Sequence, residues 1–192
     1  TYNDNAMENV MNLLRDVYNK KTPYTYVPDT LCQRARAAFD KGVECILNTQ
    51  VKQNGKLTVW CAQHDEHTLA PAKARAYELP SLSGAESDNI VLLLMSISDP
   101  SPEIIASVEA AIAWFKANKI TGIMRENFTN SEGKKDYRMI PCPQDDYPCP
   151  VLWARFYTLE DNRPFFCDRD GVKKYDISEI GYERRNGYSW YN

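Results

Sequence analysis

Apolar side chains recur at helical spacing in four stretches of the first 119 residues, and this pattern narrows the possible folds more than any other feature. The stretches run from Asn5 to Asn19, from Asp29 to Thr49, from Gly84 to Ser98 and from Ser101 to Lys119. In each, apolar residues three or four positions apart form a stripe on a helix. The third is apolar on most sides, which predicts deep burial. No strands alternate regularly with these helices, so we expect antiparallel helix pairs and no parallel sheet.

Capping residues mark the starts of two of the expected helices. Asn3 or Asp4 is a suitable N-cap for the first helix. Ser101 is a suitable cap for the fourth, with Pro102 in the first turn and Glu103 placed to complement the helix dipole. These signals predict a helix start just after each cap.

The segments between and after the helices carry turn and strand signals. Asn54-Gly55 is a tight-turn pair, and the pattern after it predicts a strand over Leu57–Ala62. We interpret Ala62–Ser83 as a structured loop, because it has neither a helical nor a strand period. From Ile120 short extended pieces alternate with polar turns, and a last helix is expected over Ser178–Asn186. The whole predicts a mainly α fold, a stack or ring of helix pairs with loops and hairpins on one face.

Composition excludes several classes of partner. Lys and Arg total 23 and Asp and Glu total 26, a net charge of −3, so the chain has no strong field for nucleic acid or an anionic membrane. The longest apolar run, Ile90–Met95, is far shorter than the ~20 residues of a membrane helix. We therefore expect neither nucleic acid nor membrane as a partner.

The 6 cysteines are too sparse for a disulfide scaffold, and the absence of any CxxC pair argues against structural zinc. Cys142 and Cys149 each sit in a PCP string. They would either close a loop as a disulfide or remain as buried thiols.

The segment Trp60–Ser87 is rich in polar and aromatic residues, and three kinds of chemistry compete for it. The cluster His64, Asp65, Glu66 and His67 is a weak metal-site candidate, because the string is not HExxH. A carboxylate pair for glycoside hydrolysis would come from a set of four acids. These acids are Asp65, Glu66, Glu78 and Glu86.

Arg75 lies between Lys73 and the pair Tyr77-Glu78. An arginine beside an acidic residue is usually one half of a plain ion pair, and the sequence alone favours that interpretation.

A second segment, Trp153–Tyr175, places three arginines among aromatic rings. Arg155, Arg163 and Arg169 each present a planar fork of donors suited to carboxylates and phosphates. The pattern is typical of an anion site, a stacking surface for sugars or bases, or a surface network of ion pairs. Of these ligands nucleic acid fits least, and the residues point to a polar, aromatic cleft for an acidic ligand.

Several long strings together resemble the family 10 polysaccharide lyases, which are pectate lyases. The strings are TYNDNAM, KGVECILNTQ, NGKLTVWCAQHDEHT, ARAYELPSLSGAES, WARFYTLEDNRPFFCDRDGVKKY and ERRNGYSWY. The resemblance extends from residue 1 to residue 192. It implies an α/α toroid, here incomplete, in which short strands and long loops form a cleft. It also implies that residues 1–192 are the C-terminal part of a single catalytic domain.

The resemblance further implies a substrate and a reaction. The substrate is polygalacturonate, and the reaction is calcium-assisted β-elimination. The proton on carbon 5 of a galacturonate is removed, the oxygen on carbon 4 leaves, and a 4,5-unsaturated product forms. Because removing that proton adds charge beside a carboxylate, nearby cations stabilise the intermediate.

Residue by residue, Arg75 in ARAYE matches the family's catalytic base. Arg155 and Arg169 match arginines that hold substrate carboxylates, and Asp4 in NDNAM resembles a calcium-site acid. An arginine base needs alkaline medium, because the pKa of free arginine exceeds ~12.

Two further residues are candidates for substrate binding, Lys73 and Tyr77. The family often has a lysine five positions before the base, where this chain has Ala70, and Lys73 would substitute for it.

The resemblance begins in the middle of the family's domain, so a second calcium-binding aspartate and part of the cleft wall are expected upstream. A chain lacking that part would leave an apolar helix face open. The alternatives are a non-catalytic module that binds acidic polysaccharide and a carboxylate-based glycoside hydrolase. Export, to the periplasm or outside the cell, is expected from the substrate.

Overall fold

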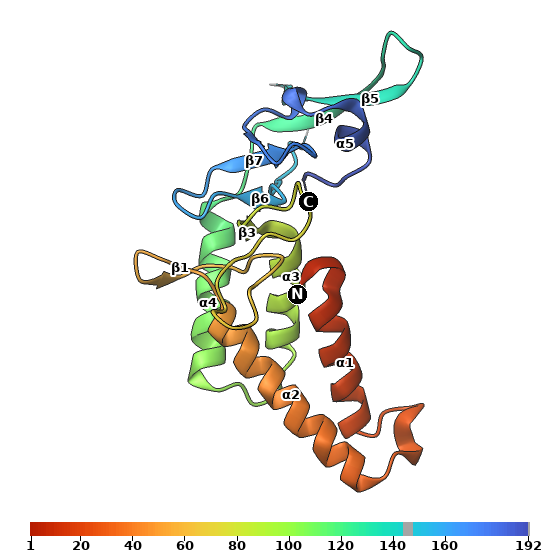
Figure 1. Cartoon of the computed structure of the whole chain (residues 1–192), viewed down its shortest axis with the longest axis vertical. Coiled ribbons are helices and arrows are strands. Elements are labelled where there is room, and N and C mark those ends of the chain that lie inside the picture. Colours follow the sequence, from red (N-terminus) through yellow and green to blue (C-terminus); the bar gives the residue numbers. More distant parts are fainter. Residues whose placement is uncertain (144–147, 192) are drawn as a thin grey trace.

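The computed structural model of the chain describes residues 1–143 and 148–191 and places its long helices apart from most of its strands (Figure 1). The first 119 residues contain α1 (Ala6–Tyr18), α2 (Asp29–Thr49), α3 (Gly84–Met95) and α4 (Pro102–Ala117). Helix α1 packs on α2 and α3 packs on α4. All four predicted helices are confirmed, with ends that differ by at most three residues.

The main core lies where these helices meet the loop that follows the first hairpin. Met11, Phe39, Ile46, Trp60 and Leu94 are all buried there. The predicted deep burial of the third helix holds in part: Ile90 and Leu94 are fully buried, whereas Leu92 and Met95 are exposed.

Of the two predicted helix caps, one is confirmed and one is wrong. Ser101 caps α4, because its Oγ accepts a hydrogen bond from the backbone N–H of Ile104. At the start of α1 the N-cap is Asn5, in a left-handed conformation and without a side-chain cap bond. Asp4 is left-handed as well, with φ of 55°. Neither Asn3 nor Asp4 caps the helix, so the Asp4 carboxylate is free for other contacts.

Three antiparallel sheets account for the strands of the described residues, in agreement with the expectation of no parallel sheet. The first hairpin joins β1 (Lys52–Gln53) to β2 (Lys56–Leu57), and Asn54 and Gly55 both have positive φ at its turn. The predicted strand over Leu57–Ala62 is wrong beyond Leu57. The residues after it are buried between two other segments. The backbone N–H of Val51 donates to Val59 O, that of Thr58 donates to Val51 O, and that of Ser83 donates to Trp60 O.

The other two sheets make up most of the upper part of Figure 1. A four-stranded sheet has the order β3-β6-β7-β8, and β4 pairs with β5 in a hairpin. The strand bounds are Leu82–Ser83 (β3), Ile123–Thr129 (β4), Lys135–Pro141 (β5), Phe156–Tyr157 (β6), Pro164–Cys167 (β7) and Lys173–Lys174 (β8).

The short helical turns of the chain are η1 (Asn3–Asn5), η2 (Tyr24–Tyr26), η3 (Ile177–Glu179) and α5 (Tyr182–Asn186). The predicted last helix over Ser178–Asn186 is therefore split into η3 and α5. Ile180 and Gly181 interrupt it with extended backbone, and the second piece ends at Gly187 as expected.

The expected α/α toroid is wrong. In the described residues the four long helices form a single packed group, and after Lys119 only the five-residue α5 is an α-helix. The physical reason is the composition of the second part of the chain. It has no further stretch with a helical stripe, so its backbone hydrogen bonds are made between antiparallel strands instead.

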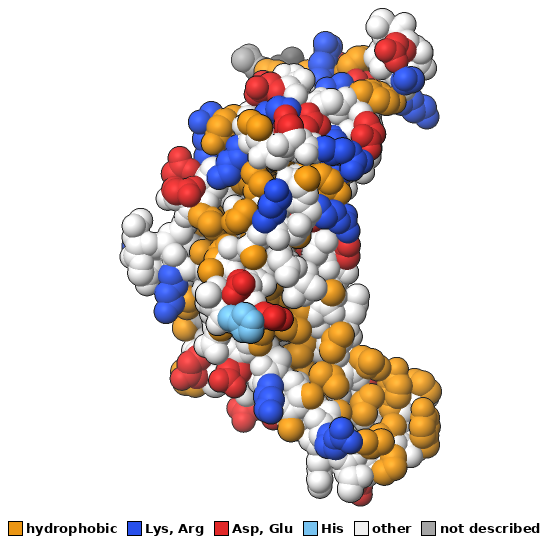
Figure 2. Space-filling model, viewed as in Figure 1, with side chains coloured by type: hydrophobic (Ala, Val, Ile, Leu, Met, Phe, Trp, Pro, Cys, Tyr) orange, Lys and Arg blue, Asp and Glu red, His pale blue; other side chains and the backbone are white. Residues whose placement is uncertain are grey.

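Cys142 and Cys149 form a disulfide, which decides between the two alternatives left open by the sequence. An apolar helix face is open as expected: Val10, Leu13 and Tyr26 are exposed on and beside α1, and Figure 2 shows apolar side chains gathered at the η2 end. In the described residues, no helix combines the length and the apolar character needed to cross a membrane.

Candidate functional site

A tight turn from Arg75 to Glu78 presents the arginine that the sequence singles out. The backbone N–H of Glu78 donates to the carbonyl of Arg75, and that of Ala74 donates to the carbonyl of Glu78, both at 3.0 Å. The buried Glu78 carboxylate accepts a third bond, from the backbone N–H of Arg75 at 3.2 Å. The backbone at position 75 is thus held firmly, while the Arg75 side chain remains 53% exposed.

Asp4, near the N-terminal end of the described residues, lies beside this turn. Its Oδ2 lies 3.5 Å from Nη2 of Arg75. The segment is fixed by Tyr2 and Asn3, whose backbone N–H groups both donate to the carbonyl of Ala62. Asp4 and Asn5 both have left-handed backbone, which Asp and Asn tolerate better than most other residues outside glycine. With this backbone the Asp4 carboxylate lies beside the arginine.

The surroundings of Arg75 favour its charged form. The Tyr77 hydroxyl, 3.4 Å from Nη1, and the carboxylates of Glu78 and Asp4 together hold the pKa of Arg75 above its ordinary value. In the absence of ligand, these neighbours therefore oppose loss of a proton from the guanidinium.

Arg155 is more buried than we would expect of a residue whose only role is to contact substrate. Its Nη2 lies 2.6 Å from the buried carboxylate of Glu86, and its side chain is only 14% exposed. The guanidinium carbon lies 4.5 Å from the ring centre of Tyr188, and Nε is buried with no hydrogen-bond partner. The ion pair fixes Arg155 in the wall of the site.

Arg169 and Tyr77 lie on the same side as Arg75. The exposed Arg169 pairs with Glu183 at 2.6 Å, and its guanidinium carbon is 5.8 Å from the Tyr77 ring centre. Lys73 is exposed and makes no hydrogen bond or ion pair within the described part of the chain. Four of the six predicted residues, Asp4, Arg75, Tyr77 and Arg169, thus lie next to one another. Arg155 is connected to them through the ring of Tyr188, and Lys73 makes no such contact among the described residues.

Two residues of the site, Arg184 and Tyr188, were missed by sequence reasoning. Arg184 on α5 is buried, with its guanidinium carbon 3.6 Å from the Tyr77 ring centre and 4.2 Å from that of Tyr188. Its Nε and Nη2 have no acceptor. The Tyr188 hydroxyl donates to Glu78 Oε1 at 3.0 Å. Only the string ERRNGYSW, charged and aromatic at once, signalled these residues.

The zinc hypothesis is not supported by the geometry. His64 is buried, its Nε2 accepts from the backbone N–H of Cys61, and its Nδ1 lies 2.9 Å from the carbonyl of Leu69. His67 is exposed. Among residues 1–143 and 148–191, no group of three or more His, Cys, Asp or Glu is placed to hold a metal ion.

Three of the four acids weighed for glycoside hydrolysis are engaged in other contacts, whereas Glu66 is 86% exposed and lies 3.4 Å from the His67 ring. Asp65 accepts hydrogen bonds from the backbone of His67 and Thr68 within its own loop. Glu78 and Glu86 are buried against arginines.

A calcium ion would find part of its coordination at the Asn3–Asp4 corner. Calcium takes about six to eight oxygen ligands, with carboxylates and amide carbonyls among them. The Asp4 carboxylate is 73% exposed, and Oδ1 of Asn3 is buried without a hydrogen-bond partner. These oxygens fit calcium in kind, and the remaining ligands would come from substrate, water and other residues.

The fold and the site bring together arginines, aromatic rings and the exposed Asp4 carboxylate, and the arginine side chains are donors suited to an anionic ligand. The family model described as Pectic acid lyase matches residues 1–192, and the chain belongs to that family. The resemblance to family 10 polysaccharide lyases is thereby confirmed.

Two solved structures are similar to this chain over its whole length. Both are of a family 10 polysaccharide lyase from Cellvibrio cellulosa, one of them an aspartate-to-alanine mutant in complex with trigalacturonic acid. Each is 40% identical, with a TM-score of 0.85, and the match covers 100% of this chain and 58% of the other. This chain therefore spans a little over half the length of those structures. No curated protein matches it.

Proposed function

We propose that this chain is part of a pectate lyase that cleaves polygalacturonate by calcium-assisted β-elimination, releasing 4,5-unsaturated oligogalacturonides. The observation that carries the proposal is the exposed Arg75 guanidinium beside the Asp4 carboxylate. The family match and the complex of a similar lyase with trigalacturonic acid support it. Since the polymer lies outside cells, we place the activity in the periplasm or outside the cell.

In this proposal Arg75 takes the proton from carbon 5 of a galacturonate. The proton lies next to a carboxylate, so its removal puts a second negative charge beside the first. Arg169, exposed on the Tyr77 side of the site, and Arg155, fixed by Glu86, hold that carboxylate and stabilise the charge. Their forked donors suit the bidentate geometry of a carboxylate.

Calcium held by Asp4 and Asn3 would neutralise part of the same charge. Asp4 would at the same time move from pairing with Arg75 to pairing with the ion. The removal of one carboxylate from the surroundings of Arg75 lowers the cost of deprotonating the guanidinium.

The raised pKa of Arg75 affects the pH range in which the reaction would run. Only the neutral guanidine accepts a proton, and its fraction grows with pH. We therefore propose that the rate rises into the alkaline range.

The raised pKa also favours a second candidate function, a module that binds acidic polysaccharide without cleaving it. Such a module needs the arginines as donors only, and a permanently charged Arg75 suits it. It would bind polygalacturonate and leave the polymer intact.

Product chemistry separates the candidates. Incubation with polygalacturonate should produce unsaturated uronide, seen as rising ultraviolet absorbance that a calcium chelator abolishes. Binding without any product would favour the module, and saturated reducing sugar without new absorbance would indicate a hydrolase. The assay should be run on the full-length parent protein as well as on residues 1–192.

A further inference from the structure

A cavity of about 480 Å³ lies between the β4–β5 hairpin and the segment that follows α5. This is within the ~300–1,000 Å³ range of small-molecule sites. Rings of Tyr137, Tyr188, Trp190 and Tyr191 contribute to its lining, and Arg125 stands on its β4 side. Aromatic faces and a few polar groups are a suitable surface for a sugar ring.

The charged side chains that line this cavity are all positive. Its lining contains two arginines and no Asp or Glu. Arg185 is neutralised by Asp136, with Nη2 at 2.6 Å and Nε at 3.0 Å from the two carboxylate oxygens. Arg125 donates only to the amide oxygen of Asn127 and lies over the Tyr137 ring, with no ion pair among the described residues. Among the residues that the structure describes, Arg125 is therefore the one arginine of this cavity without an acidic partner.

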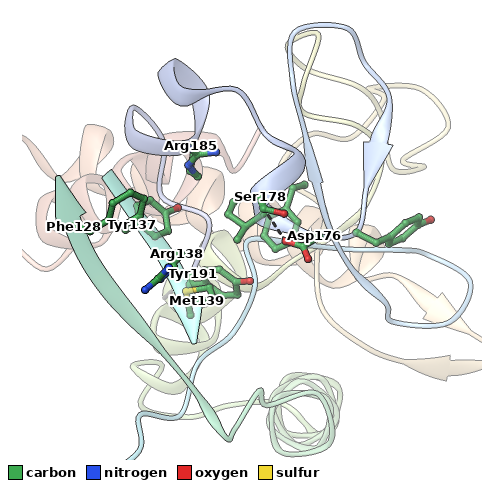
Figure 3. A pocket seen from close by; sticks show the side chains of 11 residues that line it. Phe128, Tyr137, Arg138, Met139, Asp176, Ser178, Arg185 and Tyr191 are labelled. Carbon is green, nitrogen blue, oxygen red and sulfur yellow. Dashed lines mark hydrogen bonds between the residues drawn. The ribbon is translucent and has the colours of Figure 1, made fainter. Parts of the chain in front are cut away.

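A neighbouring cavity on the same surface differs in the pairing of its arginines with acidic residues. It has a volume of about 520 Å³ and shares Tyr137, Arg185 and Tyr191 with the first (Figure 3). Its own acid is Asp176, and its other arginine, Arg138, pairs with Glu126 at 2.5 Å. The second cavity has aromatic rings but no uncompensated cation.

Tyr188 connects the Arg125 cavity with the site around Arg75. It lines the cavity, its hydroxyl donates to Glu78, and Glu78 holds the backbone of Arg75. A polygalacturonate chain carries one carboxylate on every sugar. A cation set apart from the reacting sugar can therefore bind a more distant carboxylate of the same chain.

We infer that the cavity beside Arg125 is a distal uronate subsite, which binds a galacturonate of the same polygalacturonate chain that occupies the Arg75 site. The Arg125 guanidinium takes the carboxylate, and the partly exposed rings of Tyr188 and Tyr191 contact the sugar, whereas Tyr137 and Trp190 are buried beneath them. This inference rests on the proposed substrate and does not require the proposed reaction. Its consequence is that affinity depends on chain length through Arg125.

The test compares short and long oligosaccharides by calorimetry. Trigalacturonate and hexagalacturonate are titrated into the wild-type chain, the Arg125→Gln variant and the matched control Arg138→Gln. Arg138 is an exposed arginine of the same hairpin that lines only the neighbouring cavity. Loss of one charge-assisted contact should weaken binding of the hexamer roughly tenfold. Binding of the trimer should not change, and the control should match the wild type for both.

Three results would overturn the inference. The first is an unchanged hexamer affinity in Arg125→Gln, and the second is an equal loss for trimer and hexamer. The third is a fall in thermal stability without any effect of length, which would mean that Arg125 supports the hairpin through Tyr137 and Asn127 and does not bind a sugar. Because these are binding measurements, a length effect without cleavage would leave the subsite standing. The lyase itself is refuted only if the full-length parent protein forms no unsaturated product.

Discussion

Nη2 of Arg75 lies 3.5 Å from Oδ2 of Asp4, although 71 positions separate the two residues. Both side chains are more than half exposed, and exposed ion pairs contribute only ~0–1 kcal/mol. Stability therefore does not explain a contact for which two residues adopt left-handed backbone. We attribute the contact between Arg75 and Asp4 to function, because in the proposed reaction both side chains lie beside the anionic sugar.

Replacing Asp4 by Asn tests the role of this carboxylate. Asn tolerates the left-handed backbone of position 4 nearly as well as Asp, so the fold should be unaffected. The loss of charge should raise the calcium concentration needed for half-maximal activity about tenfold or more. Rates measured in a calcium titration give this value. An unchanged calcium dependence would remove Asp4 from the metal site.

Replacing Glu86 by Gln tests the buried pair with Arg155. Breaking such a pair leaves an uncompensated buried charge and costs about 3–5 kcal/mol. We expect a clear fall in melting temperature. Arg169→Gln is the comparison, since its pair with Glu183 is exposed and its loss should scarcely alter stability. Equal effects of the two variants would contradict this difference in burial.

Replacing Glu8 by Gln tests a buried carboxyl group on α1. Glu8 is 3% exposed and neither oxygen has a hydrogen-bond partner. Burial, the largest cause, raises its pKa from 4.5 to about 7. The folded chain thus holds this proton more tightly than the unfolded chain. The contribution of Glu8 to the free energy of unfolding falls as pH rises from 4.5 to about 7, and is then constant.

Glu8→Gln should accordingly stabilise the chain by about 1–3 kcal/mol at pH values above about 7 and have little effect near pH 4.5. Denaturant unfolding at both pH values measures the difference. Glu44→Gln, at an exposed position on α2, is the matched control for the loss of one carboxylate from a helix. A stabilisation that is the same at both pH values would refute the raised pKa.

Local patterns in the sequence predicted the helices well, because an apolar stripe and a cap are written in neighbouring residues. Asp29–Thr49 begins and ends where expected, and Ser101 caps α4 as predicted. The toroid failed because it depends on how segments far apart pack together. The local pattern after Ile120 predicted extended pieces, but not that these pair into antiparallel sheets joined to one helix group.

The candidate site shows the same contrast between what neighbouring residues predict and what depends on packing between distant segments. Short strings located Arg75, Asp4 and Arg169, and the structure brings them to one place. The sequence did not reveal that Glu86 holds Arg155, since their contact joins α3 to the segment before β6. Arg184 was missed because its importance lies in burial between two rings, and burial depends on the complete fold.

The most direct measurement of the central claim is the rate at which Arg75→Lys and Arg75→Ala variants form unsaturated uronide from polygalacturonate with calcium present. The variants belong in the longest form of the protein that is active, with the melting temperature recorded for each. The account predicts that both lose several orders of magnitude in rate and keep their stability, because the side chain is exposed and its pairs are weak. A variant that loses stability but cleaves at the wild-type rate would show that Arg75 is only an ion-pair partner.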